Sequence, residues 1–175
     1  MKSMASAPTL VPVNEYLATS YHPDRDYVDG ELIERNVGEW DHSRLQALLL
    51  KQLLQYEEPL GFLAVPEQRV QVKAARFRVP DICLVRGNPG EQVLRRPPLV
   101  CIEILSPEDS MSSMQERIDD YVAFGVANVW IFDPRRRKAY WADSNGVHEE
   151  TRGVMEAAAS PIRIDLTSLW SRLQQ

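Results

Sequence analysis

Cysteine is scarce in this sequence, which has only Cys83 and Cys101 among its 175 residues. Two cysteines are too few for a disulfide framework. Long apolar runs are also missing, because the densest stretch, 45–54, is interrupted by polar residues and is too short to span a membrane. The first residues contain no apolar segment of the kind found in signal peptides. We therefore expect a soluble, cytoplasmic protein with reduced thiols.

An excess of positive charge is missing as well. The 20 lysines and arginines face 25 aspartates and glutamates, for a formal net charge of −5. Proteins that bind nucleic acid through their overall field are normally basic, so any such contact here must come from a local patch. Apolar residues make up 44% and charged residues 26%, as in globular domains. We expect residues 1–10 to form a flexible arm and residues 11–175 to form one domain.

The N-terminal part of the domain predicts a short helix and a hairpin. The helix is expected over 11–19, with Tyr16 facing inward. The hairpin is expected over 27–33, because the Asp29-Gly30 pair suits the positive φ angles of a two-residue turn.

Three further helices are predicted from apolar periodicity and capping residues. The first is long, has its leucines on one face, begins with Asp41 as its cap and is ended by residues 59–61. The second begins at a capping-box pattern over 113–116 and ends at Gly125. The third lies at the C-terminus and is capped by Thr167.

The remaining apolar segments predict strands. In chain order they cover 65–72, 77–85, 99–105, 129–132, 138–142 and 162–166. The order helix, three strands, helix, strand predicts an α/β fold with a mixed sheet flanked by helices. The hairpin and the C-terminal strand and helix are additions to this αβββαβ core.

Two carboxylates occupy strand positions where the pattern requires apolar residues. Asp81 lies within the predicted strand 77–85 and Glu103 within 99–105. An ionised carboxylate on a buried strand is costly unless it shares a proton, meets a basic partner or binds a metal ion. Oxygen ligands of this kind suit Mg²⁺ or Mn²⁺. The alternative is that either acid lies at a strand end and points to water.

The spacing of these acids ties them to the two cysteines. If Asp81 lies opposite Glu103 on antiparallel strands, Cys83 must lie opposite Cys101, because residues two apart share a face. We expect reduced thiols that pack behind the acids. A zinc site is not expected, because no further cysteine or histidine lies at ligand spacing.

Several runs carry a resemblance to a known family. They are Pro80-Asp81, the segment 98–107 around Glu103, Gly125-Val126 with Trp130, Asp133-Pro134, the segment 29–32 and His42. Together they resemble the Uma-two (Uma2) family of restriction-endonuclease-like proteins, which belongs to the PD-(D/E)XK nuclease superfamily. The resemblance covers nearly the whole chain, 11–173. It implies that the mixed sheet has the restriction-endonuclease-like fold.

The resemblance also implies a metal site and a substrate class. The carboxylates of Asp81 and Glu103 and the main-chain carbonyl of Ile104 would hold Mg²⁺ or Mn²⁺. The metal would polarise a phosphate of DNA and supply hydroxide for in-line attack. A homodimer is compatible with this, because nucleases that cut duplex DNA often pair two sites.

The basic residue of the family motif is the point of departure. Leu105, two residues after Glu103, stands where the superfamily has lysine. The family often moves that lysine to the following helix, four residues before Tyr121, where this chain has Arg117. Arginine clamps a phosphate well but does not readily act as a base. The alternative for Arg117 is an exposed helix residue that pairs with a neighbouring acid.

A third acid is expected to support the pair. Matching 70–72 with 77–79 as a hairpin places Gln68 across from Asp81, whereas the family resemblance favours Glu67. Glu67 has the better chemistry for a metal ligand but needs a bulge or a one-residue slip to share the face. Both are kept as supporting candidates.

Other polar residues have two readings each. His42 is a candidate to touch phosphate or relay a proton, or an ordinary helix-start residue. Arg135, Arg136, Arg137 and Lys138 form a basic run that is a candidate DNA contact, or an ordinary solvated turn.

The sequence is therefore compatible with two functions. The first is a metal-dependent endonuclease that hydrolyses DNA phosphodiester bonds. The second is a catalytically weak or inactive nuclease fold that serves as a binding or assembly module. The missing lysine and the acidic net charge favour the second.

Overall fold

A computed structural model describes residues 9–35 and 39–174, so residues 1–8 of the predicted arm lie outside it. In chain order its elements are α1 (Val13–Ala18), β1 (Asp26–Val28), β2 (Glu31–Ile33), α2 (Trp40–Leu54), α3 (Glu57–Leu60), β3 (Phe62–Pro66), β4 (Val70–Lys73), β5 (Arg76–Arg78), β6 (Ile82–Arg86), β7 (Val100–Ile104), α4 (Met111–Phe124), β8 (Asn128–Asp133), β9 (Lys138–Asp143), β10 (Gly146–Glu149), β11 (Val154–Glu156), β12 (Arg163–Asp165) and α5 (Leu166–Leu173).

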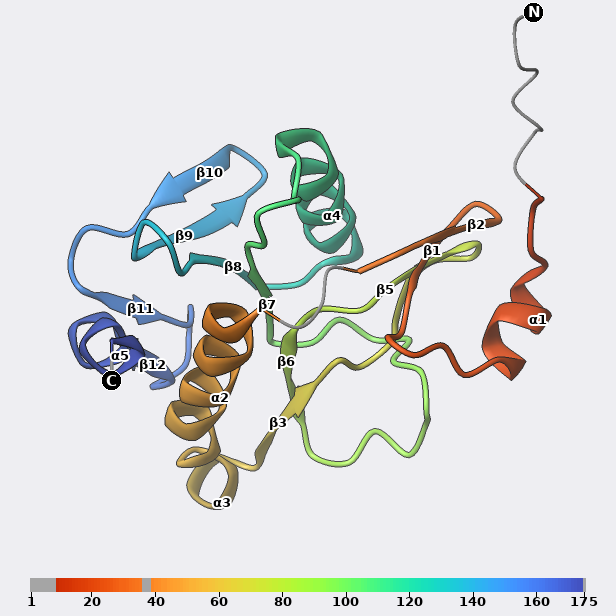
Figure 1. Ribbon diagram of the computed structural model, residues 1–175. Helices are drawn as coiled ribbons and strands as arrows, with labels where there is room; N and C mark the ends of the chain where they lie inside the picture. Colours follow the sequence, from red (N-terminus) through yellow and green to blue (C-terminus); the bar gives the residue numbers. More distant parts are fainter. Residues whose placement is uncertain (1–8, 36–38, 175) are drawn as a thin grey trace, which may run out of the picture.

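A mixed six-stranded sheet forms the centre of the molecule, in the order β10-β9-β8-β7-β6-β3. β7 and β8 run parallel and are joined through α4, whereas the other neighbours in this sheet run antiparallel. A second sheet, in the order β2-β1-β5-β4, lies beside it, and β11 pairs with β12 near α5 (Figure 1). The predicted α/β class with a mixed sheet and flanking helices is confirmed.

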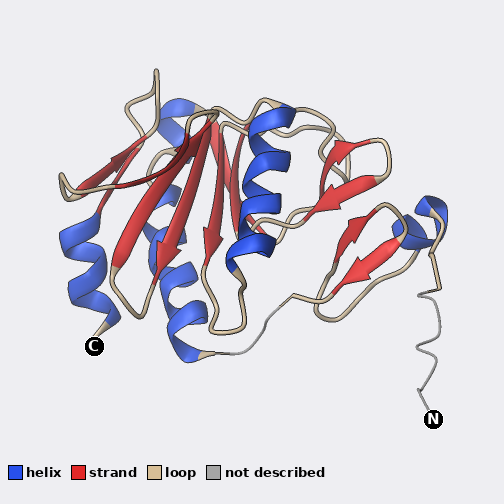
Figure 2. Cartoon of the chain, turned by 90° about the horizontal axis from the view of Figure 1, so that it is seen from above, coloured by secondary structure: helices blue, strands red, loops and turns tan. Residues whose placement is uncertain are grey.

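Helices cover both faces of the central sheet, as Figure 2 shows from above. On one face α2 and α5 pack against the even-numbered residues of β6 and β7, such as Leu84 and Ile102. On the other face α4 packs against the odd-numbered residues, including Cys83 and Cys101. Both faces of β6 and β7 are therefore buried, and full burial of one leucine or isoleucine contributes about 2 kcal/mol.

The predicted strands 65–72 and 77–85 are each wrong in the same way, because each is broken into two. β3 and β6 pair in the central sheet, whereas β4 and β5 pair in the second sheet. The chain changes sheet at Glu67, where φ is +49°, and again at Pro80, which has no N–H to donate to a strand ladder. Asp81 therefore lies at the junction of the two sheets, immediately before β6.

The predicted helix caps are displaced by a few residues. The N-cap of α2 is Glu39, not Asp41, and the helix ends at Leu54, ahead of the predicted 59–61. Ser110 caps α4 by accepting a hydrogen bond from the N–H of Ser113, and Asp165 caps α5 in the same manner. Each predicted cap was already inside its helix, since propensity marks a cap only to within one turn.

Other predictions are confirmed. α1 buries Tyr16, and β1 and β2 form the expected hairpin, with φ of +51° at Asp29 and +103° at Gly30. Gly125 ends α4 in a left-handed conformation. β10 and β11 were not predicted, since they are short and only half-buried. Within the described residues no helix is both long and apolar enough to cross a membrane.

Candidate active site

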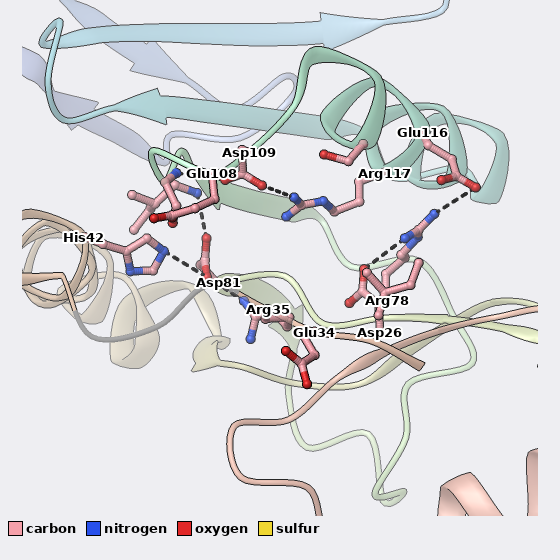
Figure 3. Close-up of a pocket in the computed structure, with 14 residues that line it drawn as sticks. Asp26, Glu34, Arg35, His42, Arg78, Asp81, Glu108, Asp109, Glu116 and Arg117 are labelled. Atoms are coloured by element: carbon pink, nitrogen blue, oxygen red, sulfur yellow. Dashed lines mark hydrogen bonds and ion pairs between the residues drawn. The ribbon is translucent and has the colours of Figure 1, made fainter. Parts of the chain in front are cut away.

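A cleft of about 170 Å³ opens where the second sheet meets β7 and the first turns of α2 and α4. Its lining is unusually rich in charge (Figure 3). The lining carboxylates are Asp26, Glu34, Asp81, Glu108, Asp109 and Glu116, and the lining cations are Arg35, Arg78 and Arg117, with His42 beside them. Six acids against three guanidinium groups give this cleft an excess of negative charge.

Asp81 is buried at the floor of the cleft and is held from three sides. Its Oδ2 accepts the main-chain N–H of Ile104 at 2.7 Å, and its Oδ1 accepts from Nη2 of Arg35 at 2.5 Å. Nε2 of His42 lies 3.4 Å from the same Oδ1. Burial alone would raise the pKa of Asp81, but His42, Arg35 and the Ile104 N–H outweigh it and hold the pKa below its usual value. Asp81 is therefore an anion at neutral pH.

Glu103 lies on β7 and is fully buried. Its Oε1 accepts from the hydroxyl of Tyr121 at 2.6 Å and its Oε2 accepts from Nη1 of Arg117 at 2.9 Å. Burial, assisted by the charge of Asp81, raises the pKa of Glu103 to about 7, although Arg117 opposes the shift. The two carboxyls of the site thus differ in their affinity for protons.

The predicted register across β6 and β7 is confirmed. Cys83 pairs with Cys101, and both thiols are buried and free. Continuing this register by two residues brings Asp81 next to Glu103, on the face of the sheet that α4 covers. Burial raises the pKa of Cys83 to about 12, so this thiol is protonated at neutral pH and packs behind the acids.

Arg117 contacts the second acid from the position that the sequence indicated. It lies on α4, is 17% exposed, and bridges Glu103 and Asp109 through its two Nη atoms. The alternative reading, an exposed residue that pairs along its own helix, is wrong, because its partners lie on β7 and on the loop before α4. Arg117 is aimed at the carboxylates and lines the cleft.

The supporting candidates next to Asp81 do not reach the cleft. The predicted hairpin register is off by one, because Val70 pairs with Arg78 and a bulge follows. Glu67, not Gln68, is the residue opposite Asp81, and its N–H donates to the Asp81 carbonyl at 3.2 Å. The Glu67 side chain is exposed, and Gln68 donates to the Gln92 carbonyl instead.

The basic run 135–138 lies apart from the acids, in the turn between β8 and β9. Arg136 pairs with Asp133 at 3.1 Å and Lys138 with Glu149 at 2.8 Å. None of the four residues of this run lines the cleft.

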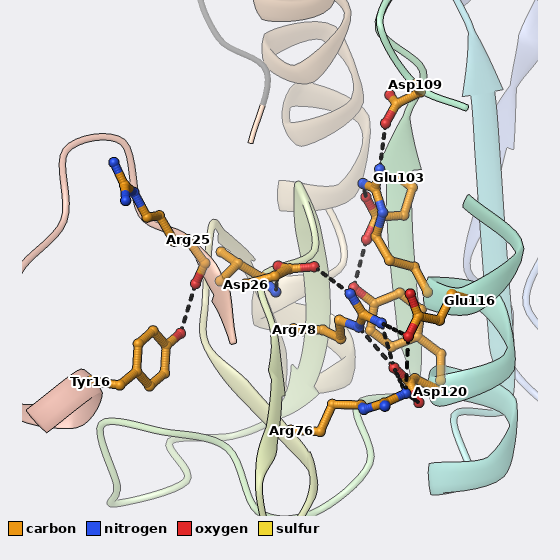
Figure 4. A network of polar contacts seen from close by, with 12 residues as sticks. Tyr16, Arg25, Asp26, Arg76, Arg78, Glu103, Asp109, Glu116 and Asp120 are labelled. Carbon is orange, nitrogen blue, oxygen red and sulfur yellow. Dashed lines mark hydrogen bonds and ion pairs between the residues drawn. The ribbon is translucent and has the colours of Figure 1, made fainter. Parts of the chain in front are cut away.

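A buried ionic network next to the cleft was missed by the sequence reading (Figure 4). Arg78 is 2% exposed and contacts Asp26 at 2.9 Å and Asp120 at 2.7 Å, so it ties β1 and β5 to α4. Arg76 adds a second contact to Asp120 at 3.1 Å. One feature of the sequence could have indicated this network. Arg78 is a charged residue on the same face of the predicted strand as the apolar Ile82.

Arg35, the closest cation to Asp81, was missed too. Arg35 follows β2 and lies outside any periodic segment. Its contact with Asp81, 46 residues later in the chain, could therefore not be predicted from the local sequence. Together Arg35 and Arg117 supply one guanidinium for each buried carboxylate.

A comparison of the sequence with family models identifies the family of the chain. The model of the Uma2 family, described as "Putative restriction endonuclease", matches residues 14–166. The chain belongs to the Uma2 family. The family that the sequence motifs resemble is thereby confirmed.

A solved Uma2-type structure has the same fold. It is the crystal structure of a "putative nuclease belonging to DUF820" from Anabaena variabilis, which is 21% identical, with a TM-score of 0.78 over 91% of this chain and 97% of that one. A cryo-electron microscopy structure of a DrdV–DNA complex matches 74% of this chain and 11% of its own, at 16% identity and a TM-score of 0.42. No curated protein matches the sequence.

The donor set of this Uma2 chain suits a divalent cation in its chemistry. Asp81 and Glu103 offer carboxylate oxygens, which Mg²⁺ and Mn²⁺ prefer, and the excess of acids in the cleft attracts a cation. Within the described residues, no group of three acidic, histidine or cysteine side chains is drawn together at ligand spacing.

Proposed function

We propose that this protein is a metal-dependent endonuclease that hydrolyses DNA phosphodiester bonds in the cleft that Asp81 lines and Glu103 adjoins. The observation that carries the proposal is the pair of buried carboxylates, one just before β6 and one on the neighbouring strand β7, beside a cleft with more acids than bases. Such a pair is costly to bury, and the membership of the chain in the Uma2 family supports a nuclease role for it.

The carboxylates of Asp81 and Glu103, with the Ile104 carbonyl, would hold Mg²⁺ or Mn²⁺. Such an ion supplies a Lewis acid for the phosphate and lowers the pKa of bound water. Ile104 fixes Asp81 through its N–H at 2.7 Å, so the first acid is oriented by the backbone of the strand that carries the second. Tyr121 orients Glu103 through its hydroxyl at 2.6 Å.

Arg117 would neutralise the charge that builds on the scissile phosphate. Its planar guanidinium already meets two carboxylates, and its fork of N–H donors fits phosphate oxygens equally well. Because arginine does not act as a base, a proton from the attacking water would need another acceptor. His42, whose Nε2 lies 3.4 Å from Asp81, would serve as this acceptor through its neutral form. The Asp81 carboxylate raises the pKa of His42 against the opposing effect of burial, so the neutral form is favoured only towards higher pH.

The charge of the cleft suggests that a bound cation would favour the entry of a DNA phosphate. A cleft lined by six carboxylates and three guanidinium groups repels a phosphate backbone. A divalent ion between Asp81 and Glu103 would remove much of this repulsion. Metal is therefore expected to tighten the binding of a phosphate inside this cleft, whereas DNA contacts outside the cleft do not require it.

Cleavage of supercoiled plasmid and of single-stranded DNA with Mg²⁺ or Mn²⁺ tests the proposal. Wild type should nick DNA only when metal is present, and Asp81→Asn and Glu103→Gln should each lose this activity. Asp143→Asn is the matched control, since Asp143 is the last residue of β9, does not line the cleft, and has a side chain that is 42% exposed. Absence of nicking, or nicking that survives in both variants, would favour the alternative of an inactive nuclease fold that binds or assembles.

A further inference from the structure

A second, larger hollow of about 550 Å³ adjoins the cleft. It lies between the first turns of α4 and the strands β8, β9 and β10. Its walls are largely apolar and include Met111, Met114, Ile118, Ile131, Tyr140 and Val147. We call it the Tyr140 groove. Its size falls in the range of small-ligand sites, about 300–1,000 Å³.

The Tyr140 groove is exposed in a way that an ordinary core is not. Met111 is 91% exposed and Val147 is 43% exposed, although both are large apolar residues. Methionine side chains adapt their shape to planar partners and make favourable contacts with aromatic rings. Tyr140 adds an aromatic face that is only half-buried.

The groove continues directly from the proposed active site. Ser106 and Asp109 line both the cleft and the groove. In the sheet, Glu103 pairs with Ile131, and Ile131 pairs with Tyr140, so the three side chains stand in one row on one face. Two strand spacings put the backbone of Tyr140 about 10 Å from that of Glu103. A polymer whose phosphate lies at Glu103 would thus reach Tyr140 with its neighbouring units.

The rim of the groove carries two arginines, Arg135 and Arg136, at the turn between β8 and β9. Asp109 and Asp133 line the groove as well. Asp133 accepts both of their N–H groups at 3.0 Å, which fixes the turn, and the Arg136 side chain is 75% exposed. An apolar floor with an aromatic ring and an arginine rim is the combination that binds unpaired nucleotides, through stacking below and phosphate contacts above.

We propose that the Tyr140 groove binds an unpaired nucleotide of the substrate, with its base against Tyr140 and Met111 and its phosphate near Arg135 and Arg136. The proposal rests on the proposed nuclease function and gives its substrate class: single-stranded DNA, or a locally unpaired strand. A duplex keeps its bases stacked inside, so it cannot insert one without paying for unstacking. An uncharged apolar peptide would fit the floor but would offer no anion to Arg135 and Arg136.

Binding of fluorescein-labelled oligodeoxynucleotides, measured by anisotropy in EDTA, separates this proposal from catalysis. Wild type should bind a single strand about tenfold more tightly than the duplex of the same sequence, since stacking of one base contributes about 1–3 kcal/mol. Met111→Glu, which leaves the fold unstrained because the side chain is exposed, should remove most of this preference. The double variant Arg135→Ala/Arg136→Ala should weaken the binding of the single strand in the same direction.

Leu54→Glu is the matched control, because it also places a glutamate at an exposed apolar helix position, 50% exposed on α2. It should bind the single strand as wild type does. Equal affinity for single strand and duplex, or a Met111→Glu variant that binds as wild type, would overturn the groove proposal. If the groove variants change self-association in light scattering but not DNA binding, the occupant is a second copy and the proposal also fails.

The two proposals fail separately. A protein that binds single strands through the groove but cleaves no DNA with Mg²⁺ or Mn²⁺ would overturn the nuclease function and leave the groove assignment standing. A protein that nicks plasmid with metal, and whose binding ignores Met111→Glu, would do the reverse.

Discussion

The guanidinium of Arg117 donates to the carboxylate of Glu103 at 2.9 Å across the gap between α4 and β7. The resemblance to the nuclease superfamily implies a lysine two residues after the second acid, where this chain has Leu105, and we propose that Arg117 takes its place. The cation therefore approaches the site from the helix and not from the strand. Its charge is kept, but its capacity to act as a base is lost.

Two replacements of Arg117 should distinguish the contribution of its positive charge from that of its guanidinium geometry. Arg117→Met leaves Glu103 buried without its cation, and we expect cleavage to fall at least about 100-fold. The free energy of unfolding should fall by about 3 kcal/mol, because breaking a buried pair leaves one charge uncompensated. Arg117→Lys should keep cleavage within about tenfold of wild type, as it restores an ammonium near Glu103. Plasmid nicking rates and urea denaturation measure the two effects.

Arg172→Met serves as the control for this series, because it removes an exposed helical arginine from α5. It should change neither quantity. Cleavage by Arg117→Met at the wild-type rate would remove Arg117 from the proposed machinery.

The raised pKa of Glu103, about 7 in the folded chain, predicts how stability depends on pH in EDTA. The unfolded chain releases this proton near pH 4.5, so between pH 4.5 and 7 the folded state holds more protons than the unfolded state. The stability contributed by protonated Glu103 is fully present below pH 4.5 and is lost as pH rises through 7. Glu103→Gln removes this titration.

Urea denaturation of wild type and Glu103→Gln at several pH values from 4.5 to 8 measures the effect. The stability of the variant relative to wild type should increase across this interval by an amount on the order of 3 kcal/mol, since each pKa unit corresponds to about 1.4 kcal/mol. A difference between the two proteins that stays constant with pH would show that Glu103 titrates normally.

Arg35 would compete with a metal ion for Asp81. Its Nη2 lies 2.5 Å from Oδ1 of that carboxylate. Arg35→Gln should therefore tighten Mn²⁺ binding, by about tenfold if the displaced contact contributes about 1.4 kcal/mol. Calorimetric titration of Mn²⁺ into the two proteins measures this.

Arg25→Gln is a suitable comparison, because Arg25 forms an exposed ion pair with Glu34 near the same hairpin. Its affinity for Mn²⁺ should equal that of wild type. Weaker Mn²⁺ binding by Arg35→Gln would mean that Arg35 holds Asp81 in its binding position instead of blocking it.

The buried network at Arg78 predicts a large, non-additive effect on stability. Arg78→Met leaves Asp26 and Asp120 without this cation, and Asp120→Leu leaves Arg78 with one partner fewer, so each should destabilise the fold by about 3 kcal/mol. The double variant should cost less than the sum of the two, because it removes both ends of one contact. Urea denaturation of all four proteins completes this cycle, and strict additivity would contradict the assignment.

Much of the fold followed from local patterns. A few neighbouring residues were enough to predict several elements: the apolar faces of α2 and α4, the buried strand β7 and the Asp29-Gly30 turn. The break at Pro80 could not be predicted in this way. The alternation of apolar residues continues from Phe77 to Val85, even though the two halves pair in different sheets. Which partner a strand chooses is decided by tertiary packing, not by its own pattern.

The residues of the candidate site also fall into those that local sequence predicted and those that only the folded chain brings together. Asp81 and Glu103 were found because a charge interrupts an apolar strand, and Arg117 because it stands where the family places a lysine. Arg35 and Asp109 come from irregular segments and meet the acids only in the folded chain. The contacts of Arg35 and Asp109 depend on how the chain folds in three dimensions and cannot be predicted from their spacing in the sequence.

Metal binding at the two buried carboxylates is the central claim, and titration of Mn²⁺ into the full chain tests it most directly. Wild type should bind one Mn²⁺ per chain, detected by the loss of the free-ion signal in electron paramagnetic resonance. Asp81→Asn and Glu103→Gln should each weaken this binding at least about tenfold, while Asp143→Asn should not. Saturable binding in wild type that both variants weaken at least about tenfold is the result predicted here. Binding that is absent in wild type, or that persists unchanged in both variants, would contradict the account.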